Sequence, residues 1–274
     1  MSGDLAGTVK AVHETPLFLK NVLHRDERTA KIIKVFGSLF TANRAAADDI
    51  HQGISEYLHF NYQEEIASVL EAAVDQYRDS PTPFEEAMQA LRTSWDVAGK
   101  AFFAIKVCEI LKRVDPGWAK RLRSIGQNLG LSDSVLAFVG AVVDPNFAEN
   151  QPPPRRPVQF RLAPAGAANS FCVEGLPDAL YVTYWQNDFY VSAGRNGASL
   201  EGKPVPANFA FRFDSLDELR FGRFRLLYRQ LQMLQRWFHQ GTNGVPKFSL
   251  KKEGRLVLRR PSFLKLSFGT PLVP

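Results

Sequence analysis

The spacing of apolar residues divides the chain into a helical half and a β half. From about residue 16 to residue 143, apolar residues recur at intervals of three and four, the period of an amphipathic helix. Clear stripes lie within residues 32–40, 50–58 and 66–77. After residue 158 the period changes to two, as half-buried strands require. The pattern predicts an α+β protein of two domains, an N-terminal all-α helical bundle and a C-terminal small antiparallel β-sandwich.

Capping signals predict where the helices begin and end. Residues 80–83 read Ser-Pro-Thr-Pro and interrupt the helical pattern, and we expect Thr82 to cap the next helix. Asp115-Pro116 predicts another helix start, with proline at the first helical position. Gly130 predicts the end of that helix, because glycine readily takes the left-handed conformation found there. Ser132 is the expected cap of the last helix in this half.

Turn signals organise the β half. Gln186-Asn187-Asp188 lies between two apolar runs and predicts a hairpin. Residues 228–237 return to helical spacing, with Leu231 and Leu234 on one side. The predicted strands are residues 158–162, 171–173, 180–184, 189–192 and 219–228.

A run of prolines separates the two halves. Residues 150–157 are polar and contain four prolines, which is typical of a stiff linker. We therefore predict four segments. They are an all-α domain (16–145), a Pro-rich linker (146–157), a β-sandwich with a following helix (158–245), and a basic, β-prone tail (246–274).

Charge is distributed unevenly along the chain. Residues 219–274, called the basic end below, hold twelve Lys or Arg and one acid, a charge of +11, whereas the first 218 residues carry −5 of the total +6. Such polarity favours binding of an anionic partner, although alternating arginines also occur on the solvated face of an ordinary strand. The candidate binding residues are Arg220, Arg223, Arg225, Arg229, Lys251, Lys252, Arg255, Arg259 and Arg260.

The sequence shows no recognisable catalytic or metal-binding pattern. His51 and His59 fall on one predicted helix, but no cysteine lies near enough to complete a zinc site. Cys108 and Cys172 are expected to be reduced, buried thiols, which favours a cytoplasmic location. There is no Gly-x-x-x-x-Gly-Lys-Ser/Thr motif and no stretch of 18 apolar residues. We predict a protein that is not an enzyme and that uses no cofactor and no metal.

The helical half resembles the tellurite-resistance TerB-like domain. The likeness covers residues 28–143 and rests on a duplicated helical hairpin, with turns at Asn43 and Asp115, and on the ending Ile125–Ser132. It implies a helical scaffold of the kind found in bacterial stress-response proteins. In that family the turns hold several acids that bind a divalent ion. Lys and Arg largely replace those acids here, so the turns lack the oxygen ligands that a hard cation needs.

The β half is similar to forkhead-associated (FHA) domains over residues 158–230. The sequence Gly194–Val205 looks like the turn of that family, through Asn196, Gly197 and Gly202, and residues 217–228 look like its closing strands. The resemblance implies a phosphothreonine pocket near residues 171–180. That segment holds two acids, no Arg, no Ser and no His, so we expect the pocket to be lost.

A helical domain followed by an FHA-like sandwich resembles the front part of some large ABC-type ATPases. The resemblance implies a non-enzymatic regulatory or adaptor module, accessory to an ABC-type ATPase or a membrane-associated system. We expect its partner to be another protein, acidic or membrane-associated. The alternatives are an anionic membrane surface, which would place the chain at the inner face of the membrane, and then nucleic acid, both contacted through the basic end.

Overall fold

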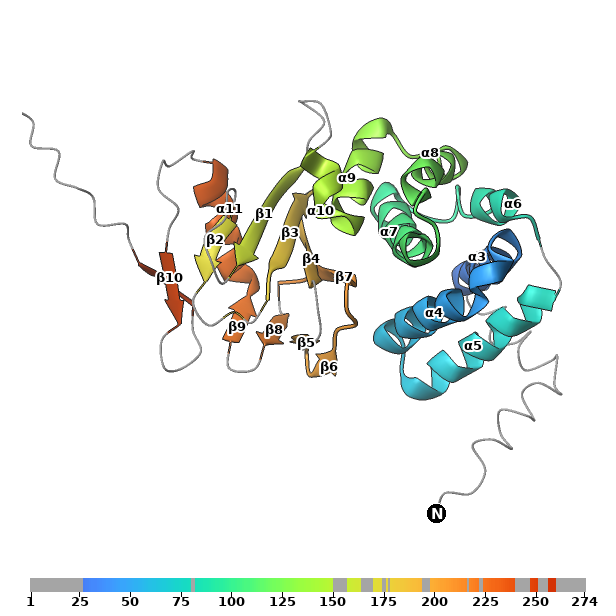
Figure 1. The fold of residues 1–274 in the computed structure, drawn as a ribbon, viewed down its shortest axis with the longest axis horizontal. Helices are drawn as coiled ribbons and strands as arrows, with labels where there is room; N and C mark the ends of the chain where they lie inside the picture. The colour runs from blue at the N-terminus through green and yellow to red at the C-terminus, as the bar shows by residue number, and fades with distance from the viewer. Residues whose placement is uncertain are drawn as a thin grey trace, which may run out of the picture.

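A computed structural model shows helices in the N-terminal half and mostly strands in the C-terminal half (Figure 1). The protein is thus an α+β protein, as its periodicity predicts. The structure describes residues 27–79, 82–149, 157–163, 170–173, 176, 178–193, 198–215, 217–221, 224–239, 247–250 and 256–259.

The helices match the apolar stripes closely. Residues of the first two stripes, such as Ile33, Phe36 and Ile54, are almost completely buried. Ile66 is an exception, because it lies in the first turn of α5 and is 45% exposed. The helices are α3 (Glu27–Ala42), η1 (Arg44–Ala46), α4 (Ala47–Asn61), α5 (Glu64–Asp79), α6 (Phe84–Gln89), α7 (Val97–Val114), α8 (Trp118–Leu129), α9 (Asp133–Val143), α10 (Pro145–Glu149) and α11 (Tyr228–His239).

Two helix starts differ from the predictions, and at a third, that of α9, Ser132 holds the predicted cap position but makes no side-chain capping hydrogen bond. Thr82 does not cap α6, because the extended backbone of Pro83 precedes the helix and provides no side-chain cap. Helix α8 begins at Trp118 rather than at Pro116, because Asp115 first forms a turn in which its Oδ1 accepts a hydrogen bond from the Gly117 amide at 2.7 Å. The predicted end of α8 is confirmed, since Gly130 is left-handed with a φ of 67°.

The strands form two sheets. The larger sheet has the order β11-β10-β2-β1-β3-β4-β7, and the smaller has the order β6-β5-β8-β9. Pairing is antiparallel apart from the two parallel pairings of β2, with β1 and with β10. The strands are β1 (Val158–Ala163), β2 (Ser170–Val173), β3 (Leu180–Trp185), β4 (Asp188–Ala193), β5 (Ala198–Leu200), β6 (Lys203–Pro204), β7 (Ala210–Phe213), β8 (Glu218–Phe221), β9 (Phe224–Leu227), β10 (Lys247–Leu250) and β11 (Leu256–Arg259).

Two tight turns connect neighbouring strands. The predicted hairpin between β3 and β4 is confirmed, with Gln186 and Asn187 both at positive φ. A second two-residue turn, Glu201-Gly202, joins β5 to β6. Gly202 has a φ of 83°, a conformation that L-residues seldom adopt, which explains why glycine occupies this position.

The predicted segment boundaries at 146 and 245 do not coincide with boundaries in the fold. Helix α10 extends into the expected linker as far as Glu149. The tail strand β10 pairs with β2, so the larger sheet continues beyond residue 245. The sequence pattern did not predict this pairing because it joins strands that are about 75 residues apart.

The helical half packs against the larger sheet through α9 (Figure 1). Phe138 of α9 stacks on Trp185 of β3 with ring centroids 4.3 Å apart, and it meets Tyr190 of β4 in a T-shaped contact. Gln159 of β1 donates a hydrogen bond to the Ala141 carbonyl at 2.9 Å. One cluster of buried side chains therefore extends from the helices into both sheets.

Candidate functional site

The structure describes only part of the predicted basic surface. Arg220 lies on β8, Arg225 on β9 and Arg229 on α11, all exposed, while Arg259 ends β11. The turn glycine Gly202 is also described. The other candidates lie outside the described residues: Asn196, Gly197, Arg223, Lys251, Lys252, Arg255 and Arg260.

Two arginines face each other on the outer side of the smaller sheet. The register places Arg220 directly opposite Arg225, and Ser199 of β5 opposite Arg220. The neighbours Leu219, Phe221, Phe224 and Leu226 are buried, which turns the arginines outward. The side chains of Arg220 and Arg225 are 57% and 46% exposed. We call these two residues the arginine pair.

Glu218 holds the arginine pair together. One of its carboxylate oxygens accepts a hydrogen bond from Nε of Arg220, and the other accepts one from Nη2 of Arg225. Hydrogen bonding to Arg225, and then to Arg220, lowers the pKa of Glu218 despite its partial burial. The charge asymmetry of the sequence did not indicate this contact, because Glu218 lies one residue before the basic end.

Further acids surround the same strand. Oε1 of Glu201 accepts a hydrogen bond from the Glu218 amide at 2.9 Å. Near the start of β8, the Asp217 carboxylate accepts one from the Asp214 amide at 2.6 Å. Burial is the main cause that raises the pKa of Asp217. The described part of the basic end is therefore less positive at its edge than the sequence count suggests.

The tail lies beside the arginine pair. Strand β11, which ends at Arg259, contacts β9, which carries Arg225. Helix α11 follows β9 directly and presents Arg229 and Arg236 to solvent. The fold thus brings β9, α11 and β11 into one neighbourhood, as a shared binding surface requires.

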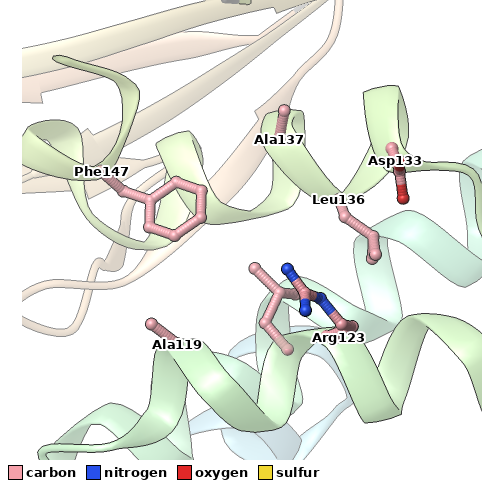
Figure 2. A pocket seen from close by; sticks show the side chains of 7 residues that line it. Ala119, Arg123, Asp133, Leu136, Ala137 and Phe147 are labelled. Atoms are coloured by element: carbon pink, nitrogen blue, oxygen red, sulfur yellow. The ribbon is translucent and has the colours of Figure 1, made fainter. Parts of the chain in front are cut away.

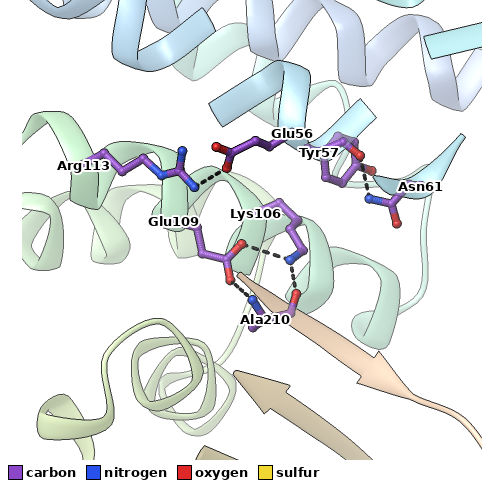
Figure 3. Close-up of polar contacts among 7 residues, drawn as sticks. All are labelled: Glu56, Tyr57, Asn61, Lys106, Glu109, Arg113 and Ala210. Atoms are coloured by element: carbon purple, nitrogen blue, oxygen red, sulfur yellow. Dashed lines mark hydrogen bonds and ion pairs between the residues drawn. The ribbon is translucent and has the colours of Figure 1, made fainter. Parts of the chain in front are cut away.

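A second polar site is buried where the helices meet the larger sheet. Lys106 and Glu109 of α7 are only 1% and 7% exposed, and their charged groups lie 2.9 Å apart (Figure 3). Nζ of Lys106 donates a hydrogen bond to the carbonyl of Ala210, and Oε1 of Glu109 accepts one from the Ala210 amide at 2.6 Å. Nζ of Lys106 also lies 3.3 Å from the centroid of the Phe209 ring. We call Lys106 and Glu109 the buried pair.

The buried pair has a structural explanation. Ala210 belongs to β7, the last strand of the larger sheet, and both of its outward backbone groups are satisfied by α7 side chains. The pair thus takes the place of a further strand at this position. Burial lowers the pKa of Lys106 and raises that of Glu109, although their mutual attraction opposes both shifts. Strongly perturbed groups often mark active sites, but these two are out of reach of a substrate.

Two cavities open between helices. One of about 150 Å³ lies among α8, α9 and α10, with Leu122, Leu136 and Phe147 as its apolar wall and Arg123 and Asp133 as polar residues (Figure 2). The other, about 350 Å³, is lined by residues that include Phe84, Glu85 and Arg121. Neither cavity contacts a residue of the predicted basic surface.

Several residues of types that bind metals in other proteins are paired or buried in this one. Asp115 forms an ion pair with Arg121 at 2.8 Å, so a cation of the chain itself occupies this turn. His59 hydrogen-bonds to Glu64 at 3.0 Å and to Glu71 at 3.4 Å. Cys108 is buried, and burial raises the pKa of its thiol far above the usual range. In the part of the chain that the structure describes, no group of three His, Cys, Asp or Glu side chains is arranged to hold a metal ion.

None of the described helices combines the length and the apolar character needed to cross a membrane. Comparison of the chain with models of known protein families, with curated proteins and with solved structures gives no match. The resemblances to TerB-like and FHA domains thus stay predictions made from sequence motifs.

Proposed function

We propose that this protein is a non-enzymatic adaptor that binds an acidic segment of another protein through the basic end. The observation that carries the proposal is the arginine pair. Its two guanidinium groups lie side by side on an exposed sheet face, and a carboxylate already bridges them. Guanidinium groups recognise carboxylates through directed hydrogen bonds, so a partner with several acidic side chains matches this face.

The burial of aromatic and apolar side chains in the described part of the basic end favours a protein partner over nucleic acid or a membrane. Single-stranded nucleic acids stack on exposed aromatic rings, but Phe221 and Phe224, the aromatic residues of β8 and β9, are buried. Insertion into a lipid surface needs exposed apolar side chains. Among residues 219–221 and 224–236, the part of the basic end whose side-chain exposure the structure describes, Met233 is the one large apolar side chain that is exposed.

The proposed architecture agrees with an adaptor role. We assign the helices to a TerB-like domain and the two sheets to a shortened FHA-like β-sandwich, on the motifs described above. Because these motifs resemble the front part of ABC-type ATPases, we place the protein as an accessory part of such an ATPase or of a membrane-associated system, in the cytoplasm or at the inner face of the membrane. Two acids in the segment 171–180 argue against phosphothreonine binding.

A binding experiment tests the proposal. Fluorescently labelled poly-L-glutamate is titrated with the full chain, and anisotropy gives the dissociation constant. We expect Arg220→Gln/Arg225→Gln to weaken binding about two- to thirtyfold, because each of the two exposed ion pairs contributes about 0.2–1 kcal/mol. The matched control is Lys120→Gln/Arg123→Gln, which removes two exposed charges from α8.

The control separates a local site from general attraction. If both double variants lose affinity equally, the arginine pair is not the binding site. Parallel titrations use vesicles of phosphatidylserine and phosphatidylcholine and a single-stranded DNA oligonucleotide. Tighter binding to the vesicles or to the oligonucleotide than to poly-L-glutamate would show that the partner is a membrane surface or a nucleic acid and not a protein.

A further inference from the structure

The arginine pair is unfavourable by itself. Arg220 and Arg225 face each other in the antiparallel register of β8 and β9, where like charges repel at close range. One carboxylate, that of Glu218, hydrogen-bonds to both of them. Glu218 therefore stabilises an arrangement that the sheet geometry alone would disfavour.

Glu218 leaves most of the arginine donors unused. Each guanidinium carries five N–H donors, and Glu218 engages one nitrogen of each residue, Nε of Arg220 and Nη2 of Arg225. Both arginine side chains remain about half exposed, whereas Glu218 is only 17% exposed. A second carboxylate thus has access to the pair from solvent, while Glu218 lies beside it on the same face of β8.

The cluster also keeps an excess positive charge. Two arginines and one glutamate sum to +1, although the nearby Glu201 carboxylate offsets part of the attraction for an incoming anion. Its affinity is limited, because it must compete with a carboxylate that is attached to the same strand and is always present at high local concentration. The Glu218 backbone is held in place by Glu201 on one side and by the β8–β9 ladder on the other.

We infer that Glu218 is an internal competitor for the arginine pair, which it releases when a carboxylate of an acidic protein segment binds. The inference rests on the proposed function and adds a mode of regulation to it. Glu218 weakens the binding of isolated anions, because they must compete with it for the same two guanidinium groups. A partner with adjacent acidic side chains displaces it, because several carboxylates together outcompete one.

The test is Glu218→Gln, which removes the charge and keeps the shape. We expect this variant to bind poly-L-glutamate up to about fivefold more tightly than the parent, which corresponds to at most about 1 kcal/mol for one exposed ion pair. The control is Glu201→Gln, which removes one nearby negative charge from a side chain that bonds to the Glu218 amide and not, among the described residues, to an arginine. An equal gain in both variants would mean that only the overall charge matters and would overturn the inference.

The outcomes distinguish this inference from the proposed function. If Arg220→Gln/Arg225→Gln weakens binding and Glu218→Gln leaves it unchanged, the function stands and the competitor is ruled out. If the double variant binds like the parent, the proposed site itself is wrong. Circular dichroism checks that each variant is folded.

A measurement on the parent protein tests the same inference without the Glu218→Gln variant. The protein is labelled with ¹³C, and the carboxyl signal of Glu218 is followed by NMR at pH 7 while unlabelled poly-L-glutamate is added. If poly-L-glutamate displaces Glu218 from the arginine pair, the chemical shift of this carboxyl signal should move toward that of an exposed glutamate. A Glu218 signal that stays in place at saturation would overturn the inference, even if Glu218→Gln fails to fold.

Discussion

Removing either member of the buried pair should destabilise the protein strongly. Glu109→Leu leaves the ammonium group of Lys106 buried without a counter-charge, and it leaves the Ala210 amide without its acceptor. Lys106→Met leaves a buried carboxylate and frees the Ala210 carbonyl. Breaking a buried ion pair in this way costs about 3–5 kcal/mol of the free energy of unfolding.

The double variant Lys106→Met/Glu109→Leu should lose less than the sum of the two single changes. It buries no charge, and its remaining cost is the pair of unsatisfied backbone groups of Ala210, about 1–3 kcal/mol each. The single changes sum to about 8 kcal/mol and the double variant should lose about 4 kcal/mol at the centres of these ranges, so we expect a coupling of about 4 kcal/mol. The measurement is equilibrium urea unfolding followed by circular dichroism.

The neighbouring ion pair of Arg113 and Glu56 is the matched control (Figure 3). Unlike the buried pair, whose two residues both lie on α7, it joins two helices, α4 and α7, at 2.5 Å, and both of its side chains are partly exposed. Arg113→Gln should cost no more than about 1 kcal/mol. If the effects of Lys106→Met and Glu109→Leu add within about 0.5 kcal/mol, the two residues act independently and the reasoning fails.

Two further predictions concern the helical half. Partial burial lowers the pKa of His59, but hydrogen bonds to Glu64 and Glu71 outweigh it and raise the pKa above 6.5. This contribution to stability is present below pH 6.5 and is lost as the pH rises through the folded-state pKa, so the melting temperature of Glu71→Gln should differ from that of the parent more at pH 5.5 than at pH 8.5. A Cβ at Gly37 would lie 2.6 Å from Cβ of Tyr77 and push α3 and α5 apart. Gly37→Ala should therefore lower the free energy of unfolding by about 1–3 kcal/mol, and a neutral result in urea unfolding would show that the helices can separate without cost.

Local patterns in the sequence determined most of the helices and strands. The buried stripes of α3 and α4, the glycine end of α8 and the hairpin at residues 186–187 depend on a few neighbouring residues, and the sequence predicted each of them. Helix starts were predicted less accurately, as at α6 and α8. A turn residue such as Asp115 can bond to the backbone in more than one way, and only the folded chain selects one of them.

The tertiary structure alone decided the contacts that matter for the site. The two residues of the buried pair are three positions apart on one helix. The strand edge that they cover is at Ala210, about 100 residues away in the sequence. Arg220 faces Arg225 because of a strand register, and Glu218 bridges them because residues two apart on a strand share a face. The pairing of β10 with β2 likewise joins distant segments. Periodicity in a sequence reports which residues turn inward, but it carries no information on which distant residue each one meets.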